Sequence, residues 1–216
     1  MKNIRAVNFA ILLFFLKFFS WVMFGLKIRG LKNVPRKGGV LIVSNHISNF
    51  DPVIAGISAP RELSYMAKKE LFKNFFLRNL IKLFKAFPVN RTGVVKDAFE
   101  KAFKVLRQGD ALLIFPEGTR GDGKYIKDAK PGTGMIIYKA KPKVVPLIIL
   151  GTDKVLPKNK KSFHFCKIST FFGKPIDLER FFKMTENKET YGLISAEITL
   201  ALNDLLKTST IESGSQ

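Results

Sequence analysis

The chain alternates between short, unbroken apolar runs and longer stretches with helical periodicity. The apolar runs predict buried strands at residues 40–44, 62–67, 111–115 and 144–150, with a further strand at 163–172. Helical spacing predicts helices at residues 52–58, 67–87, 92–108, 132–140, 178–184 and 191–207. Strands that are apolar throughout, separated by helices, indicate an α/β fold with a central, largely parallel mixed sheet flanked by helices.

A polar sequence, S-N-H-I-S-N-F-D-P, directly follows the first of these strands. His46 and Asp51 lie in the turn that leads into the next helix. An imidazole beside a carboxylate is a minimal general base, because the carboxylate fixes the tautomer and stabilises the imidazolium. A second interpretation makes Asp51 the N-cap of a helix that begins at Pro52, with His46 an ordinary loop histidine.

A second polar sequence, I-F-P-E-G-T-R-G-D-G, follows the strand at 111–115. Gly118 lets the backbone approach a ligand, and Arg120 can bind a phosphate through two parallel hydrogen bonds. Taken alone, the sequence is equally typical of a surface loop of mixed charge. Binding sites in parallel sheets form beyond the carboxyl ends of the strands, which is where both polar sequences fall.

Residues 9–26 are almost wholly apolar, with Lys17 near the middle. A central lysine costs about 2.5–3.5 kcal/mol in a membrane-spanning helix, and a convincing signal-peptide cleavage site is lacking. We therefore expect an N-terminal apolar helical membrane anchor that lies in the interface plane, with a true span as the alternative. The expected organisation is a membrane-associating segment at 1–29, a catalytic domain at 30–207 and a polar tail at 208–216.

Composition points to anionic partners. The 216 residues carry a net charge of +20, which suits phospholipid head groups, nucleic acid or a phosphorylated substrate. The basic, aromatic helix at 67–87, with Lys68, Lys69 and Lys73 near its start, can face either solvent or a membrane. The single Cys166 excludes an intramolecular disulfide, and the sequence holds no zinc-ligand cluster, RNP stretch or G-x-S-x-G elbow.

The two polar sequences together resemble a known family. N-H-x-x-x-x-D followed by F-P-E-G-T-R resembles the PlsC-type glycerolipid acyltransferases, the 1-acyl-sn-glycerol-3-phosphate acyltransferases. A-F-P-V-N-R, ending in Arg91, is similar to the second block of that family, and V-V-P-L-I-I-L around Pro146 is similar to its fourth. The chain departs from the family at Asn90, where an acid is common, and at Gly121, where a serine is usual.

The resemblance implies a role for each matching residue. His46 would be the general base and Asp51 its orienting partner, in a direct transfer from acyl-CoA or acyl-carrier protein to the sn-2 hydroxyl of lysophosphatidic acid. The residues implied to bind this acceptor are Arg91, Glu117, Gly118, Thr119 and Arg120. Lys68, Lys69 and Lys73 are further candidates for contacting the phosphate or the acidic donor.

The expected setting is phospholipid biosynthesis on the cytoplasmic face of the inner membrane, with membrane phospholipids as partners, no nucleic acid, no metal and no cofactor beyond the acyl donor. An acyltransferase acting on glycerol-3-phosphate or another lysophospholipid remains an alternative. A basic membrane-binding protein without catalysis is the alternative outside enzymes.

Overall fold

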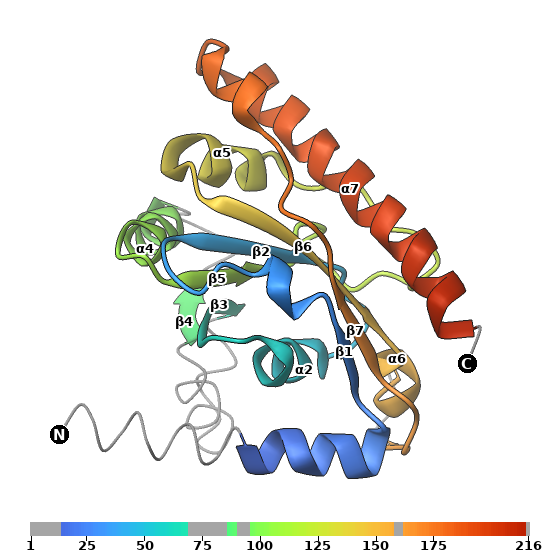
Figure 1. Ribbon diagram of the computed structural model, residues 1–216. Coiled ribbons are helices and arrows are strands. Elements are labelled where there is room, and N and C mark those ends of the chain that lie inside the picture. The colour runs from blue at the N-terminus through green and yellow to red at the C-terminus, as the bar shows by residue number, and fades with distance from the viewer. Residues whose placement is uncertain (1–13, 69–85, 90–95, 158–161, 215–216) are drawn as a thin grey trace, which may run out of the picture.

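The computed structural model describes residues 14–68, 86–89, 96–157 and 162–214. In this part of the chain a seven-stranded sheet lies between two layers of helices (Figure 1). The strands are β1 (Lys27–Arg29), β2 (Val40–Ser44), β3 (Leu63–Lys68), β4 (Ala86–Val89), β5 (Ala111–Ile114), β6 (Lys143–Leu150) and β7 (Ser169–Phe172). Their order is β1-β7-β6-β2-β5-β3-β4, and the β6–β7 pair is antiparallel whereas the other pairs are parallel.

Helices cover both faces of the sheet. Those labelled in Figure 1 are α2 (Asp51–Ser58), α4 (Lys96–Arg107), α5 (Pro131–Ala140), α6 (Thr152–Val155) and α7 (Lys188–Gly214). A helix at residues 14–24 precedes β1, and short 3₁₀ turns occur at Leu31–Asn33 and Glu179–Lys183. Helices α4, α5 and α7 lie on one face, and α2 lies on the other together with the N-terminal helix.

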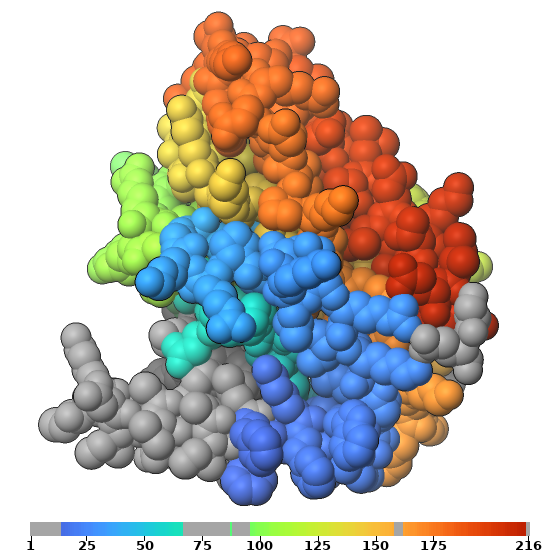
Figure 2. Space-filling view, in the orientation of Figure 1, coloured from blue at the N-terminus to red at the C-terminus, as the bar shows by residue number. Residues whose placement is uncertain are grey.

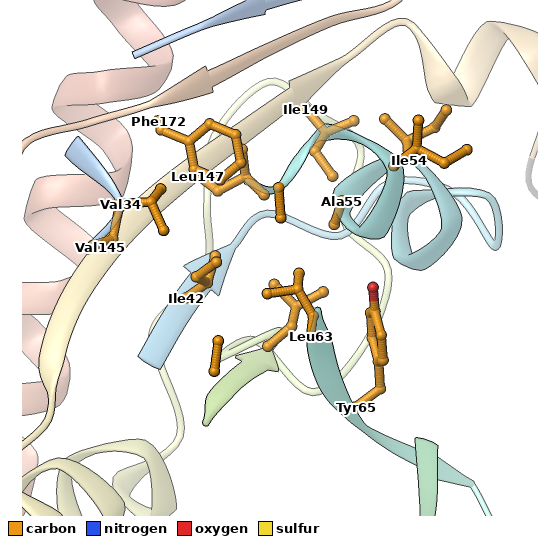
Figure 3. Packing of buried hydrophobic residues seen from close by; sticks show 14 of the residues in the cluster. Val34, Ile42, Ile54, Ala55, Leu63, Tyr65, Val145, Leu147, Ile149 and Phe172 are labelled. Carbon is orange, nitrogen blue, oxygen red and sulfur yellow. The ribbon is translucent and has the colours of Figure 1, made fainter. Parts of the chain in front are cut away.

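The core consists of two apolar layers, one on each face of the sheet. Successive residues of β2 alternate between them, so that Ile42 packs in the layer beneath α2 while Leu41 and Val43 pack beneath α4, α5 and α7. All three side chains are fully buried. Figure 3 shows the first layer, in which Ile54 of α2 and Leu147 of β6 also lie. A strand buried on both faces is apolar throughout, as the sequence pattern predicted.

Most of the predicted elements are confirmed, and two of them differ. Residues 86–89 form a strand, so the helix predicted at 67–87 does not extend to its expected end; residues 69–85 lie outside the described part of the chain. Of the strand predicted at 163–172, only Ser169–Phe172 pairs with the sheet. In the segment before it, Phe163 and Phe165 are exposed at the surface. The short helix α6 was not predicted.

Two elements extend across the boundaries that were predicted for the domain at 30–207. β1 pairs with β7, so residues 27–29 belong to the sheet and not to the N-terminal segment. Helix α7 continues through residues 208–214, where Ser209 is 1% exposed, and most of the expected polar tail is therefore helical. Glu212 accepts a hydrogen bond from Arg29 at 2.5 Å, which ties this last part of α7 to the sheet edge.

No helix within the described residues is both long and apolar enough to cross a membrane.

The contact between α5 and α7 allows a first prediction. A Cβ built on Gly134 of α5 would lie 2.0 Å from the backbone oxygen of Tyr191, whereas one on Gly192 of α7 would meet nothing within 4 Å. We expect Gly134→Ala to lower the free energy of unfolding by about 1–3 kcal/mol, because the two helices must separate. The control Gly192→Ala should raise the same free energy by roughly 0.5–1 kcal/mol, because alanine favours a helix more than glycine does. Urea unfolding followed by circular dichroism measures both; equal effects would contradict the packing described here.

Candidate active site

Three loops meet where adjacent parallel strands end. β2 lies between β6 and β5, with Val43 opposite Ile114 and Ser44 opposite Leu147. The segments that leave these strands are the loops 45–50 and 115–130 and, after β6, Gly151 with the start of α6 at Thr152. The two polar sequences singled out above therefore lie side by side at one edge of the sheet, as predicted.

The Asp51 carboxylate is the most densely bonded group at this edge. Its Oδ2 accepts hydrogen bonds from the backbone N–H groups of Ile47 and Ser48, both at 2.7 Å, and from the His46 ring at 2.8 Å. Its Oδ1 accepts a hydrogen bond from the Thr152 hydroxyl at 2.5 Å. The side chain is fully buried, so four protein donors replace the water that the carboxylate loses.

His46 is held in one orientation. Because its Nδ1–H donates to Asp51, the network assigns the proton to Nδ1 and leaves Nε2 able to accept one. The ring stacks on Phe115, with centroids 4.1 Å apart and planes 20° from parallel. Its side chain is 17% exposed, so the imidazole is largely shielded but still reachable from outside. This is the geometry of a general base that takes a proton from a hydroxyl group.

Asp51 does not cap helix α2, contrary to the second interpretation of the sequence. The N-cap residue is Phe50, whose side chain makes no capping hydrogen bond, and Asp51 and Pro52 are the first two helical residues. The carboxylate instead turns back toward the preceding loop, where Ile47 and Ser48 supply two backbone donors. The dyad interpretation is therefore the one that the geometry supports.

Two further polar side chains fasten the His46 loop to β6. The Asn45 amide donates to the backbone oxygen of Ile149 and accepts from its N–H, both at 2.9 Å, so it continues the β2–β6 ladder by one side chain. Thr152, directly beyond β6, is fully buried against Asp51. Sequence reasoning missed Thr152, although a small polar residue just past a buried strand at the same sheet edge was a usable signal.

Glu117 connects the two polar sequences to each other. Its side chain accepts backbone hydrogen bonds from His46 at 3.4 Å and from Lys127 at 3.3 Å. The residue is only 4% exposed, and burial raises the pKa of its carboxyl above the usual range, with the two backbone donors opposing that rise. Gly121 N–H donates to the His46 oxygen at 2.7 Å beside it. A Cβ on Gly121 would lie 3.0 Å from Glu117 Oε2, so a larger residue here would need a small shift of the Glu117 side chain.

The remaining predicted site residues divide into two groups. Gly118 adopts a φ of +71°, which glycine tolerates best, while Thr119 is exposed and Arg120 is partly buried. All three belong to the turn beside His46. Arg91, Lys69 and Lys73 lie outside the described residues, and Lys68 ends strand β3, where only its backbone is described.

The chemistry available at the site is proton transfer with anion binding. Among the described residues, no group of three or more His, Cys, Asp or Glu side chains could hold a metal ion. In this geometry the His46 ring can act as a base, the Asp51 carboxylate can stabilise an imidazolium, and the Arg120 guanidinium is suited to a phosphate or carboxylate. An alcohol and an anionic group on one substrate would satisfy both functions.

Comparison with known proteins identifies the family. A family model described as Acyltransferase matches residues 25–150, and this chain therefore belongs to the acyltransferase family. The chain is 29% identical over 184 residues to the 1-acyl-sn-glycerol-3-phosphate acyltransferase of Bacillus subtilis, covering 85% of this chain and 87% of that one. It is 34% identical over 161 residues to a probable 1-acyl-sn-glycerol-3-phosphate acyltransferase of Mycoplasma pneumoniae, covering 68% of this chain and 60% of that protein.

A solved structure has the same fold. The 1-acyl-sn-glycerophosphate acyltransferase PlsC from Thermotoga maritima superimposes with a TM-score of 0.72 over 94% of this chain and 82% of that chain, at 23% identity. The α/β architecture with a mixed sheet is thereby confirmed, and the resemblance to PlsC-type enzymes drawn from the two polar sequences is confirmed by the relatives.

The hydrogen bond from Thr152 to Asp51 allows a second prediction. Thr152→Val keeps the shape of the side chain but removes the donor, so the buried carboxylate loses one of its four hydrogen bonds. We expect kcat for acyl transfer to fall by about tenfold, corresponding to about 1.4 kcal/mol, with KM unchanged.

The matched control is Thr152→Ser, which keeps the hydroxyl and should restore most of kcat. Steady-state kinetics of both variants measure the effect. Equal loss in the two variants would show that the methyl packing matters and the hydroxyl does not.

Proposed function

We propose that this protein transfers an acyl group from a thioester to the sn-2 hydroxyl of 1-acyl-sn-glycerol-3-phosphate, giving phosphatidic acid. The observation that carries the proposal is the hydrogen bond of 2.8 Å between His46 and Asp51, located beside the F-P-E-G-T-R turn at one sheet edge. The names of the Bacillus and Mycoplasma relatives support this acceptor.

The proposed reaction is a direct displacement. The acceptor hydroxyl gives its proton to His46 Nε2 as its oxygen bonds to the thioester carbonyl carbon. The tetrahedral intermediate then collapses, the carbon–sulfur bond breaks, and the imidazolium returns the proton to the departing thiolate. The Asp51 carboxylate stabilises the imidazolium, so neither a metal nor an acyl-enzyme is required.

Arg120, together with Arg91, is the proposed binder of the acceptor phosphate. A guanidinium presents two parallel donors to a phosphate, and Arg120 is three residues from Glu117, which itself bonds the His46 backbone. The next residue, Gly121, donates its N–H to the His46 backbone oxygen, which keeps this turn beside the base. Gly118 and Thr119 complete this turn and are proposed to contact the glycerol phosphate through their backbone and hydroxyl groups.

Glu117 takes a different part in the proposal from the one that the resemblance implied. Its carboxylate is buried and accepts two backbone hydrogen bonds, so it is better placed to hold the His46 loop against the acceptor-binding turn than to contact the acceptor. Its contribution to substrate binding is then indirect, through the position of Arg120.

The proposed acyl donor is acyl-CoA or acyl-carrier protein, both of which are acidic. The net charge of +20 favours either one, and Lys68, Lys69 and Lys73 are the proposed contacts. No cofactor is required by this reaction, since the thioester brings its own leaving group.

The proposed location is the cytoplasmic face of the inner membrane, with the protein seated in one leaflet. The helix at residues 14–24 exposes several large apolar side chains, among them Phe14, Trp21 and Phe18, which are each more than half exposed. Such a surface is unusual for a protein surrounded by water and suits the boundary between head groups and acyl chains. The expected partners are membrane phospholipids.

The mechanism gives a third prediction. His46→Ala should lower kcat for acylation of detergent-dispersed lysophosphatidic acid by about 10²–10⁴, because the hydroxyl loses its general base. The control is His164→Ala, which removes the second of the chain's two histidines and should keep full activity. Formation of phosphatidic acid from radiolabelled acyl-CoA measures both. Full activity of His46→Ala would overturn the mechanism.

The phosphate contact gives a fourth prediction. Arg120→Ala should raise KM for lysophosphatidic acid by about 10–100-fold, the equivalent of one charge-assisted hydrogen-bonded pair, while KM for acyl-CoA stays the same. The control is Arg107→Ala at the end of α4, next to the opposite edge of the sheet. Acceptor profiling of the wild type accompanies this experiment, and preferential acylation of glycerol-3-phosphate would replace the acceptor proposed here.

A further inference from the structure

A second apolar element lies at the surface beside the N-terminal helix. Phe163 and Phe165, in the irregular segment 162–167, are 49% and 61% exposed. Backbone hydrogen bonds hold the segment at both ends, since His164 N–H donates to the Val155 oxygen at 2.9 Å and Ile168 N–H donates to the Phe24 oxygen at 3.0 Å. The exposed rings are therefore presented by a fastened segment.

The two phenylalanines belong to one aromatic cluster with the end of the N-terminal helix. The Phe163 and Phe165 rings lie 5.7 Å from each other and 5.9 Å each from the buried ring of Phe24. Phe50, the residue before Asp51, lies 5.7 Å from Phe24 and 6.0 Å from Phe163. The cluster thus reaches from the surface to the start of α2, next to the catalytic dyad.

The exposed face of the N-terminal helix continues this apolar surface. Its large side chains that are more than half exposed are Phe14, Phe15, Phe18, Phe19, Trp21 and Val22. In Figures 1 and 2 this helix lies at the lower end of the molecule, and the segment that follows α6 reaches the same end. Two parts of the chain far apart in sequence therefore form one surface, larger than a single helix face.

Three lysines are close to the segment, either along the chain or through its backbone hydrogen bonds. Lys167 lies two residues after Phe165, Lys154 precedes the residue that bonds His164, and Lys27 donates its backbone N–H to Ile168. All three lysines are exposed, with Asp153 of α6 as a partly buried acid among them. An apolar surface edged with lysines matches an anionic lipid leaflet, whose surface potential stabilises each nearby lysine by about 1 kcal/mol.

We propose that Phe163 and Phe165 insert into the same anionic leaflet as the helix at 14–24 and act as a second, separate contact with lipid. A helix that lies flat on a leaflet can roll about its own axis, whereas a second contact beside it sets the roll angle. Through Phe24 and Phe50, that angle fixes the height of the His46 loop above the acyl chains. The function of this contact in delivering a lipid acceptor rests on the proposed function; the contact itself does not.

Depth-dependent quenching tests the insertion directly. Trp21 is the chain's single tryptophan, so Trp21→Phe gives a background without indole. In that background, Phe163→Trp places one indole on the segment, and Leu200→Trp places one on α7, at a position that is 63% exposed. Vesicles of phosphatidylcholine with 30% phosphatidylglycerol, carrying brominated acyl chains, should quench the first indole and leave the second unchanged. Absence of quenching at position 163 in vesicle-bound protein would overturn the proposal.

A binding experiment measures the energetic contribution. Phe163→Ser with Phe165→Ser should lower the partition coefficient on the same vesicles by about tenfold or more, since two half-exposed aromatic rings no longer enter the leaflet. The variant should still unfold in one cooperative transition, which shows that it folds, with a lower midpoint because both rings also pack against Phe24. Unchanged partitioning would overturn the proposal. A wild-type dimer in solution that dissociates in the double variant would also overturn it, because the surface would then bind a second copy of the chain.

Activity in detergent separates this proposal from the proposed function. With detergent-dispersed acceptor the double variant should keep the wild-type kcat, because Phe163 and Phe165 do not contact the dyad. Failure of the wild type to acylate lysophosphatidic acid would refute the proposed function and leave the quenching result as it stands.

Discussion

The site depends on one buried carboxylate and the four donors around it. Asp51 is completely removed from water, and the loop from His46 to Ser48 folds back because its N–H groups have this carboxylate as their acceptor. Backbone hydrogen bonds therefore hold the Asp51 carboxylate in place, and the carboxylate in turn sets the orientation of the His46 ring. Thr152 adds a bond from the start of α6, just after β6, so the position of the base depends on the ends of both β2 and β6.

The arrangement of strands explains why these groups meet at all. β6, β2 and β5 are neighbours and run parallel, so their carboxyl ends deliver three loops to one edge. Glu117 then connects the second loop to the first through the His46 N–H, and Asn45 connects the first to β6. A buried acid with a raised pKa is acceptable here because it satisfies two backbone donors that would otherwise lack partners.

The sequence predicted the elements that follow from periodicity, and the dyad, because His46 and Asp51 are close along the chain. It did not predict β1, whose three residues are too few for a pattern to identify and which pairs with β7 from a distant part of the chain. Thr152 and the inward direction of Glu117 depend on contacts between segments distant in sequence, which no local pattern encodes. The end of α7 was missed for the same reason. Glu212 bonds to Arg29 and Ser209 is buried, and neither contact can be recognised from the polar sequence of this part of the helix.

The short path between the N-terminal helix and β1 has a practical consequence. The helix ends at residue 24 and β1 begins at Lys27, while Phe24 and Leu26 are 3% and 7% exposed in the core. A shortened protein intended for work without lipid would lose an edge strand and two core side chains if it began at residue 30. Truncation ahead of Phe24 removes most of the aromatic face and leaves the sheet intact.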